Sequence, residues 1–322
     1  MSLPLSDGPV GGARPGRLGV GVLGAGRVGA VLGSALRSAG HAVVGASGVS
    51  EDSRERIATL LPGVENLEIP DVVERAELVL LAVPDDALAD LVAGLAEVGA
   101  WQGGQIVAHT SGRYGTDVLA PAQSAGAIPL AIHPAMTFTG TSLDLARLIG
   151  CTFAVTAPGP VLPIGQALVV EIGGEPVVVD ESARGLYHAA LAHGANHLVV
   201  LVAQAAQALE AAGIDRPGRL LAPLLGAALD GATRSADVRD GVGPGAIAAL
   251  TGPVSRGDVG TVATHLEVLG DLAARTGATD VPDSYMQLAR GATRRALASH
   301  RIDEDAARTL LDVLGAPPQE KE

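Results

Sequence analysis

The chain has few residues of the kinds that carry much of enzyme chemistry. Among its 322 residues there is one cysteine, Cys151, and one lysine, Lys321 in the C-terminal tail. A single cysteine excludes an internal disulfide, a Cys-x-x-Cys redox pair and a cysteine-ligated cluster. A lysine confined to the tail excludes a Schiff base or a Tyr-x-x-x-Lys pair in the folded core. Aromatic residues are 2% of the chain, which leaves few surfaces on which nucleic-acid bases could stack.

Positive charge is also scarce. The chain has 22 basic and 35 acidic residues, and its net charge is −13. This balance argues against nucleic acid or an anionic membrane as the main partner, because both require a basic surface. Hydrophobic residues are 48% and charged residues 18% of the chain, so disorder over its whole length is excluded. The length favours about two domains.

No long run of apolar residues is free of polar groups, although the mean hydropathy is +0.34. The most apolar long stretch, 186–209, should not cross a membrane, because a spanning segment of about 20 residues tolerates few polar side chains. Its polar residues are His188, His193, Asn196, His197, Gln204 and Gln207. The first 16 residues lack the apolar core of a secretion signal. We therefore expect a cytoplasmic protein.

Strand and helix patterns alternate from residue 17 to residue 180. Short apolar runs predict strands at 18–23, 41–46, 78–83, 106–109, 129–133, 151–155 and 177–179. Helical patterns at 28–39 and 161–172 lie between such runs. This alternation predicts an α/β fold, a doubly wound parallel sheet of the Rossmann type.

After Asp180 the strand patterns end. The remaining sequence predicts helices at about 182–212, 217–234, 258–276, 281–300 and 304–314. We therefore predict a flexible leader (1–16), a dinucleotide-binding domain (17–180), an all-helical substrate and dimerisation domain (181–315), and a flexible tail (316–322).

A glycine-rich fingerprint directly follows the first predicted strand and opens a helix. Its sequence is Gly24-Ala25-Gly26-Arg27-Val28-Gly29, a G-x-G-x-x-G in the context that dinucleotide binding requires. Gly24 permits a tight turn, Gly26 lets a pyrophosphate approach the backbone, and Gly29 allows close packing of the helix. The N–H groups at the start of the helix would hold the phosphates. The alternative is a glycine-rich turn without a nucleotide.

The end of the second strand carries no carboxylate to bind a ribose 2′-hydroxyl. Serines and an arginine are found there instead, with Ser47 at the strand end and Arg54 shortly after it. Hydroxyl and guanidinium groups suit a 2′-phosphate, which favours NADP over NAD. The alternative is that the serines form a capped loop, with Ser53 capping a helix that begins at Arg54.

Three other strand ends carry polar residues. They are Val83-Pro84-Asp85, His109-Thr110-Ser111 and His133-Pro134. Ligands of open α/β sheets bind beyond the carboxyl ends of the strands, so we expect Ser111 and His133 to face the nicotinamide. Asp85 could instead cap the next helix, His133 could have a structural role, and His109 is expected to be buried in the core.

The long helix after Asp180 has a polar stripe that includes His193, Asn196 and His197. The stripe could line a cleft, with Asn196 orienting a substrate, or it could face solvent. His193 and His197 have the spacing of metal ligands, but no third ligand is evident and we expect no metal. Farther on, Arg256 lies on a loop where it could hold a carboxylate or a phosphate. Its alternative roles are an ion pair with Asp258 and a contact between subunits. Asp258 is a good N-cap for the helix that follows.

These motifs together resemble one family. They are the fingerprint, Val83-Pro84-Asp85, His109-Thr110-Ser111-Gly112, His133-Pro134 with Thr137-Phe138, Tyr187-His188-Ala189-Ala190, Asn196, Thr251-Gly252-Pro253 and Arg256-Gly257-Asp258. The set is similar to Rossmann-like oxidoreductases whose helical C-terminal half is a domain of unknown function (2520), within the 6-phosphogluconate dehydrogenase-like superfamily. The resemblance covers residues 17 to about 302. It implies NADP binding by the first domain and homodimers built through the helical one.

The chain departs from one feature of the wider superfamily. Ketopantoate reductases of that superfamily use a lysine with an asparagine in proton transfer, and this chain has Asn196 without a core lysine. A histidine would then supply the proton, with His133, His193 and His188 as candidates in that order. We expect an NADPH-dependent reductase of a small carbonyl compound such as a 2-oxo acid. The alternatives are an imino acid reductase and a non-catalytic NADP-binding sensor.

Overall fold

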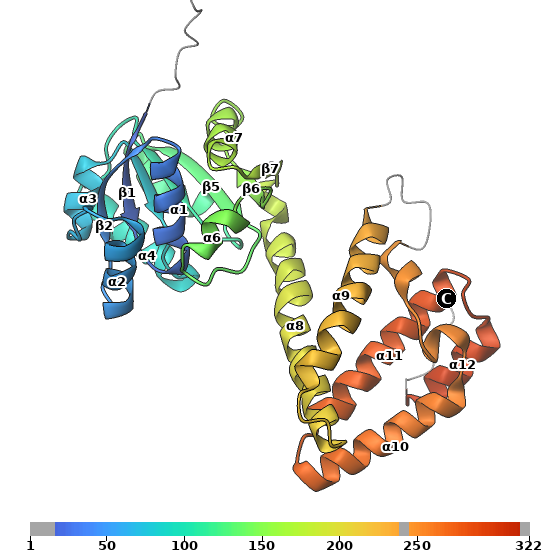
Figure 1. The fold of residues 1–322 in the computed structure, drawn as a ribbon. Helices are drawn as coiled ribbons and strands as arrows, with labels where there is room; N and C mark the ends of the chain where they lie inside the picture. The colour runs from blue at the N-terminus through green and yellow to red at the C-terminus, as the bar shows by residue number, and fades with distance from the viewer. Residues whose placement is uncertain (1–16, 238–244, 316–322) are drawn as a thin grey trace, which may run out of the picture. The chain divides into compact units, whose positions relative to one another are not determined.

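The computed structural model describes residues 17–237 and 245–315, so the predicted leader and tail lie outside the described residues. The chain forms two compact units that divide between Ala192 and His193. This division lies inside α8 (Arg184–Ala211), a helix that begins in the first unit and continues into the second. The predicted boundary at Asp180 comes shortly before the first residue of this helix, which Figure 1 labels α8.

The first unit is built on a seven-stranded sheet in the order β2-β1-β3-β4-β5-β6-β7. The strands are β1 (Gly19–Leu23), β2 (Ala42–Ser47), β3 (Leu78–Leu81), β4 (Ile106–His109), β5 (Ile128–Pro134), β6 (Thr152–Thr156) and β7 (Glu175–Val178). The predicted doubly wound Rossmann sheet is confirmed. One pairing departs from it, because β6 runs antiparallel to β5. The link between these strands contains only the short helix α6 (Leu143–Arg147) and reverses the chain, and strand direction is not encoded in an apolar run.

Helices cover both faces of the sheet. They are α1 (Arg27–Ser38), α2 (Glu51–Leu60), α3 (Ile69–Arg75), α4 (Asp85–Glu97), α5 (Ala120–Ser124), α6 (Leu143–Arg147) and α7 (Leu162–Glu171). One apolar cluster joins the sheet to α1 and α7, and a second joins it to α3, α4 and α5. The sheet is therefore the middle of three layers, as buried parallel strands require.

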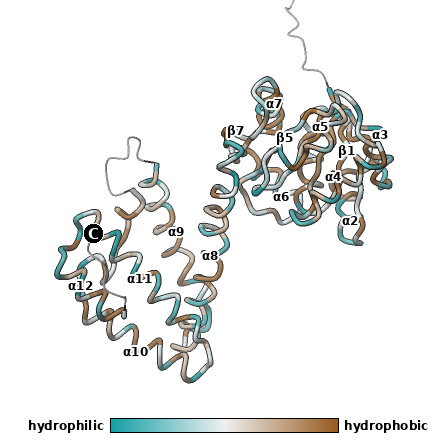
Figure 2. The backbone as a smooth tube through the Cα atoms, turned by 180° about the vertical axis from the view of Figure 1, so that it is seen from behind, coloured by the Kyte–Doolittle hydropathy of each residue, from teal (hydrophilic) through white to brown (hydrophobic). Residues whose placement is uncertain are grey.

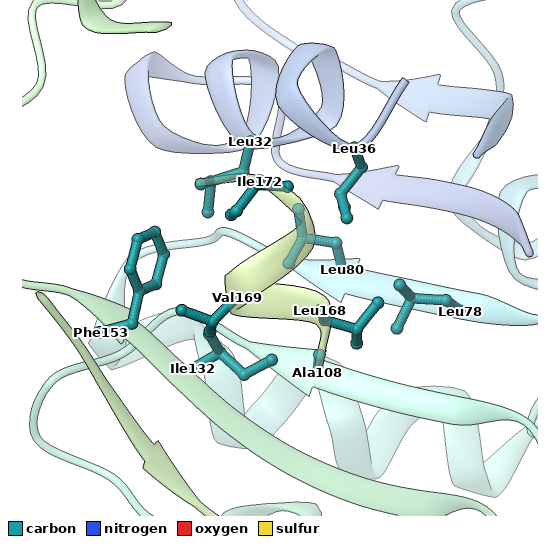
Figure 3. Close-up of a pocket in the computed structure, with 10 residues that line it drawn as sticks. All are labelled: Leu32, Leu36, Leu78, Leu80, Ala108, Ile132, Phe153, Leu168, Val169 and Ile172. Atoms are coloured by element: carbon teal, nitrogen blue, oxygen red, sulfur yellow. The ribbon is translucent and has the colours of Figure 1, made fainter. Parts of the chain in front are cut away.

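The layer between the sheet, α1 and α7 contains a small apolar cavity of about 30 Å³. Leu80, Ala108, Ile132 and Phe153 of the sheet point into it, opposite side chains from the two helices (Figure 3). A space of this size with no polar lining stays dry. It is a packing defect in the core, lined by apolar side chains.

The carboxyl ends of the central strands lie at one edge of the sheet. Leu23 of β1 pairs in register with Leu81 of β3, which pairs with His109 of β4. His109 in turn pairs with Ala131, two residues before His133 in β5. The fingerprint, Val83, Ser111 and His133 therefore share one edge, as the sequence pattern predicts.

The second unit consists of helices in the described residues. After α8 come α9 (Pro217–Ala236), α10 (Val259–Thr276), α11 (Asp280–Ala298) and α12 (Glu304–Val313), close to the predicted ranges. The N-cap prediction at Asp258 is confirmed, because its side chain accepts a hydrogen bond from the N–H of Thr261. Figure 2 shows hydrophobic and hydrophilic stretches alternating along these helices. The apolar faces of α10, α11 and α12 meet in a core around Val262, Ala296 and Leu310.

One helical segment, Glu181–Ala211, is long and apolar enough to cross a membrane by length and composition alone. Only 6% of its most apolar window is buried within the structure. The segment also has polar contacts that a lipid-facing helix would lack. The buried amide of Gln204 donates hydrogen bonds to the backbone carbonyl and carboxylate of Asp280 and to the hydroxyl of Ser284. This part of the polar stripe packs against α11.

Candidate functional site

The fingerprint forms a tight turn that leaves the start of α1 open. Gly24 has φ +84°, a conformation that favours glycine. The N–H groups of Gly24 and Ala25 donate to the carbonyl of Ser47, which ties the turn to β2. A Cβ on Gly29 would lie 2.2 Å from the carbonyl oxygen of Gly24, whereas a Cβ on Gly26 would meet no atom within 4 Å. The chain thus packs tightly around Gly29 and leaves space at Gly26.

The N-terminus of α1 has no cap of its own. Gly26 is the N-cap residue, no side chain bonds to the free N–H groups, and the first turn has no acidic residue. The first N–H groups of a helix lack partners within the helix, and its dipole is positive there. An uncapped helix start beside open space suits a pyrophosphate. The residues present therefore fit a dinucleotide.

The region predicted for the 2′-phosphate is partly a capped loop. Ser50 is the N-cap of α2 and accepts from the N–H of Ser53, so the helix begins at Glu51 and the predicted start at Arg54 is wrong. The cause is that Ser50 reaches the N–H three residues on, which the sequence allowed equally for Ser53. Ser47 is buried, and Arg54 is exposed on the first turns of α2.

A second arginine of α2 lies closer to the fingerprint. A Cβ on Gly140 would lie 2.8 Å from Nε of Arg56 and 3.1 Å from Cα of Arg27. The loop at Gly140 therefore brings α2 next to the first residue of α1. Asp144 holds this loop, because its buried carboxylate accepts from the N–H groups of Thr139 and Gly140. These hydrogen bonds lower the pKa of Asp144 despite its burial.

Beyond β3 the chain passes over the fingerprint and enters α4. The Cγ1 atom of Val83 would be 3.0 Å from a Cβ on Gly24. Pro84 is the N-cap residue of α4, and Asp85 lies in its first turn without a side-chain cap hydrogen bond. The capping role considered for Asp85 is therefore wrong. An acidic residue in the first turn is still favourable to the helix dipole.

The loop after β4 is organised by buried polar groups. Nε2 of His109 lies 2.7 Å from the carbonyl of Gly115, so it carries the proton, and Nδ1 accepts from the N–H of Ser111. His109 is buried as predicted, and burial lowers its pKa to about 4. The hydroxyl of Ser111 accepts from the N–H groups of Arg113 and Tyr114, so its oxygen holds the loop.

His133 lies against this loop and is paired with a tyrosine. Its Nδ1 is 2.8 Å from the hydroxyl of Tyr187, which comes from α8. A Cβ on Gly112 would be 2.9 Å from its Nε2 and 3.0 Å from Cδ2 of His188, so only glycine allows this approach. Burial, followed by the charge of Arg184, lowers the pKa of His133 to about 4. Burial of the ring, more than the charge of Arg184, therefore keeps the pKa of His133 below that of a free histidine.

That cation is Arg184, whose side chain is completely buried at the start of α8. Its Nη2 donates to the carbonyls of Ala131 and Ala154 at 3.0 and 3.1 Å, and its Nη1 donates to the carbonyl of Ser111 at 3.3 Å. Its Nε donates to the hydroxyl of Thr156. All these acceptors are neutral, so the guanidinium charge acts on its surroundings instead of being cancelled by a carboxylate.

Glu181 fixes the other side of the same loop. Its carboxylate accepts from the N–H of Thr116 at 2.7 Å and from the N–H of Asp117 at 3.4 Å. A Cβ on Gly115 would lie 2.1 Å from this carboxylate, so the close approach requires glycine. The segment from Glu181 to Tyr187 thus joins the ends of β4, β5 and β6.

The remaining predicted site residues belong to the helical unit. His193, Asn196 and Arg256 are exposed there. Nδ1 of His193 lies 2.8 Å from Nδ1 of His197, so one ring donates to the other. Among the described residues, no group of three or more His, Cys, Asp or Glu side chains is placed to hold a metal ion. Within the described part of the chain, Arg256 forms no ion pair with Asp258, whose carboxylate accepts hydrogen bonds from Thr261.

Sequence reasoning missed two members of the cluster, Arg184 and Tyr187. Tyr187 belongs to the family motif Tyr187-His188-Ala189-Ala190, but the sequence analysis predicts roles only for the histidines of this helix and for Asn196. Arg184 lies one turn before it, on the same side of the helix as His188. Arg184 could have been predicted as a site residue, because it is an arginine at the start of an apolar helix in a chain without a core lysine.

Comparison with known proteins agrees with this architecture. The profile of the Rossmann-like domain matches residues 3–134, and that of a domain of unknown function, DUF2520, matches residues 151–292. No curated protein sequence matches the chain significantly.

Three solved structures share the fold. A provisionally named NADP oxidoreductase from Bacteroides fragilis is 20% identical, with a TM-score of 0.66 over 86% of this chain and 98% of that one. An imine reductase from Pseudomonas sp. is 18% identical, with a TM-score of 0.60 over 93% and 100%. A reductive aminase from Aspergillus terreus, solved with NADPH and ethyl levulinate, is 17% identical, with a TM-score of 0.60 over 92% and 99%. The chain therefore carries a Rossmann-like domain followed by a DUF2520 domain, and it shares its fold with these solved structures.

Proposed function

We propose that the chain is an NADPH-dependent oxidoreductase that reduces a small carbonyl compound, such as a 2-oxo acid. The observation that carries the proposal is that an uncapped helix start and a partly buried His133–Tyr187 pair lie at the same edge of the sheet. The fold is shared with NADP oxidoreductases. NADPH would supply a hydride, and the protein would supply binding, orientation and a proton.

The cofactor would be held by the fingerprint. The free N–H groups at the start of α1 would bind the pyrophosphate beside Gly26. Ser47, Arg54 and Arg56 are the groups near the end of β2 that would favour a 2′-phosphate. Val83, Pro84 and Asp85 would lie along the nicotinamide side of the same edge.

A proton can reach the substrate without an imidazolium ion. With a pKa of about 4, His133 is neutral at pH 7. The substrate oxygen would take the proton from Nε2 of His133 while Nδ1 takes the hydroxyl proton of Tyr187, so the imidazole stays neutral throughout. The resulting phenolate would be stabilised by Arg184, whose guanidinium carbon lies 5.9 Å from the tyrosine ring centroid. Solvent would then return the proton to Tyr187.

Burial raises the pKa of Tyr187, and Arg184 opposes part of that increase. The phenol therefore holds its proton at pH 7 and can donate it to a neighbouring base. This pair offers a proton source in a chain whose one lysine lies in the tail. His188, with a ring centroid 6.3 Å from that of His133, is a second group in contact range.

The residues of the helical unit complete the proposal. We propose that Asn196 and His193 orient the substrate and that Arg256 holds its carboxylate. Apolar side chains on α8 and α9 are exposed, including Val199 at 69%, Leu224 at 61% and Leu229 at 53%. Exposed apolar surface of this extent favours cover by a partner, and we propose a homodimer in the cytoplasm.

An imine substrate is the second candidate, because two of the structures that share the fold are an imine reductase and a reductive aminase. The first experiment is to follow NADPH oxidation by absorbance with 2-oxo acids, imino acids and aldehydes, and to titrate NADPH and NADH binding in parallel. Turnover of oxo acids supports the proposal, and turnover of imines alone supports the alternative. Tight NADPH binding without any turnover would favour a sensor, and absent nucleotide binding would overturn all three.

A further inference from the structure

A second pocket lies at the opposite end of the sheet from the fingerprint. Its volume is about 410 Å³, within the range of small-molecule sites. Leu18 precedes β1, His41 precedes β2 and Ile106 opens β4, so the pocket faces the amino ends of the strands. Its outer wall is one face of α7. Nothing in the proposed reaction uses this pocket.

The walls are apolar except at one place. Ile164, Ala167 and Leu168 of α7 face Leu18 and Ile106 across the pocket. The polar groups that line it are His41 and Glu171. The His41 side chain is 2% exposed and that of Glu171 is 21% exposed, so the carboxylate reaches the pocket while the imidazole lies behind it.

The hydrogen bonds fix the charge of this pair. The backbone N–H of Leu18 donates to Nδ1 of His41, so Nδ1 carries no proton. Nε2 therefore carries the proton and donates to Oε2 of Glu171 at 2.7 Å. The imidazole is neutral in this arrangement and cannot cancel the charge of the carboxylate. Within the described ranges, no arginine comes within 4 Å of Glu171.

A partly buried carboxylate in an apolar pocket selects a ligand of opposite charge. An anion would be repelled by Glu171, and a neutral apolar molecule would leave the carboxylate without its water. An ammonium group would pair with the carboxylate while a short alkyl chain covers Ala167 and Leu168. We propose that this pocket binds a small aliphatic ammonium ion, through Glu171 and the apolar face of α7. The proposal is independent of the reductase activity.

The test is thermal unfolding of the full chain with n-butylammonium chloride, compared with n-butanol, sodium butyrate and sodium chloride at equal concentration. A ligand of the native state raises Tm, by about 2 °C at ten times its Kd for a protein of this size. We expect the increase with n-butylammonium alone. An equal increase with n-butanol, or none with the amine, would overturn the proposal.

Variants locate the binding. Glu171→Gln keeps an oxygen that accepts from His41 but removes the charge, so it should weaken n-butylammonium binding at least tenfold. Ala167→Phe should abolish binding by filling the pocket from its exposed wall. Glu175→Gln, at an exposed carboxylate on β7, makes the same change in net charge and should bind normally. Binding that survives Glu171→Gln would contradict the assignment. NADPH affinity should be unchanged in all three variants, which separates this proposal from the cofactor site.

Discussion

Nδ1 of His133 and the hydroxyl oxygen of Tyr187 lie 2.8 Å apart, although 54 positions separate the two residues in the chain. The contact joins the end of β5 to the first turns of α8. If Tyr187 supplies the proton through His133, Tyr187→Phe should lower kcat about 100-fold, the usual contribution of general acid catalysis. The Kd for NADPH, measured by fluorescence titration, should stay within about twofold because the phenol lies away from the fingerprint.

The helical unit provides a matched control for this substitution. Nδ1 of His265 and the hydroxyl of Tyr285 are also 2.8 Å apart, with ring centroids 5.7 Å from each other. Tyr285→Phe removes the same atom from a similar pair and should leave kcat unchanged. If both substitutions lower kcat equally, the effect is structural and the relay is contradicted.

Most of the fold and the edge of the sheet that holds the candidate site could be predicted from local patterns, whereas the contacts of His133 could not. Apolar runs such as 78–83 mark buried strands, and the context of Gly24 to Gly29 marks the turn, because both signals lie within a few residues. The cluster at His133 depends on Arg184 and Tyr187, which reach it only because α8 begins beside β5 and β6. The direction of β6 is likewise decided by tertiary packing. Long-range contacts of this kind leave no periodic trace in one sequence.

The depressed pKa values of His109 and His133 predict a loss of stability in mild acid. Each has a pKa of about 4 in the folded chain against an ordinary value of 6.5. Between pH 6.5 and 4 the unfolded chain therefore binds more protons than the folded one, so stability falls as the pH falls through this window. Burial is the main cause of both shifts, so the combined effect should be on the order of several kcal/mol.

Urea unfolding at several pH values, followed for the unit that contains the sheet, checks this prediction. His133→Gln cannot titrate, so its stability should depend less steeply on pH below 6.5 than that of the unaltered chain. His300→Gln, at an exposed histidine of the helical unit, should leave the slope unchanged. A histidine that titrates near 6.5 in the folded chain would give no such slope and would contradict the buried, neutral state.

The apolar cavity in Figure 3 predicts an increase in stability on filling. Ala108→Val adds two methyl groups to a β-strand residue that lines the cavity, and it should raise the free energy of unfolding by about 0.5–1 kcal/mol. Ile132→Val enlarges the same space and should lower the free energy by about 0.5–1.5 kcal/mol. Denaturant titration measures both. A loss of stability for Ala108→Val would mean that the surrounding side chains have already closed the space.

We expect Arg54 and Arg56 of α2 to make the protein bind NADPH more tightly than NADH. Arg54→Gln and Arg56→Gln should each weaken NADPH binding about tenfold, because a charge-assisted contact to the 2′-phosphate is lost. NADH, which lacks that phosphate, should bind as before. Arg75→Gln breaks an exposed pair with Glu65 and serves as the control for net charge. If NADH and NADPH weaken equally, the 2′-phosphate does not lie at α2.

Alanine substitutions at the two fingerprint glycines Gly26 and Gly29 should have different effects on Tm and on NADPH affinity. A Cβ on Gly26 meets no protein atom within 4 Å, so Gly26→Ala should keep its Tm. The added methyl group would occupy the space through which a pyrophosphate approaches the helix start, and NADPH affinity should fall tenfold or more. A Cβ on Gly29 would lie 2.2 Å from the carbonyl of Gly24, so Gly29→Ala must displace the turn and should lower both Tm and affinity. Calorimetric titration and thermal unfolding separate the two results. Undiminished NADPH binding by Gly26→Ala would place the pyrophosphate elsewhere and remove the basis of the proposed cofactor site.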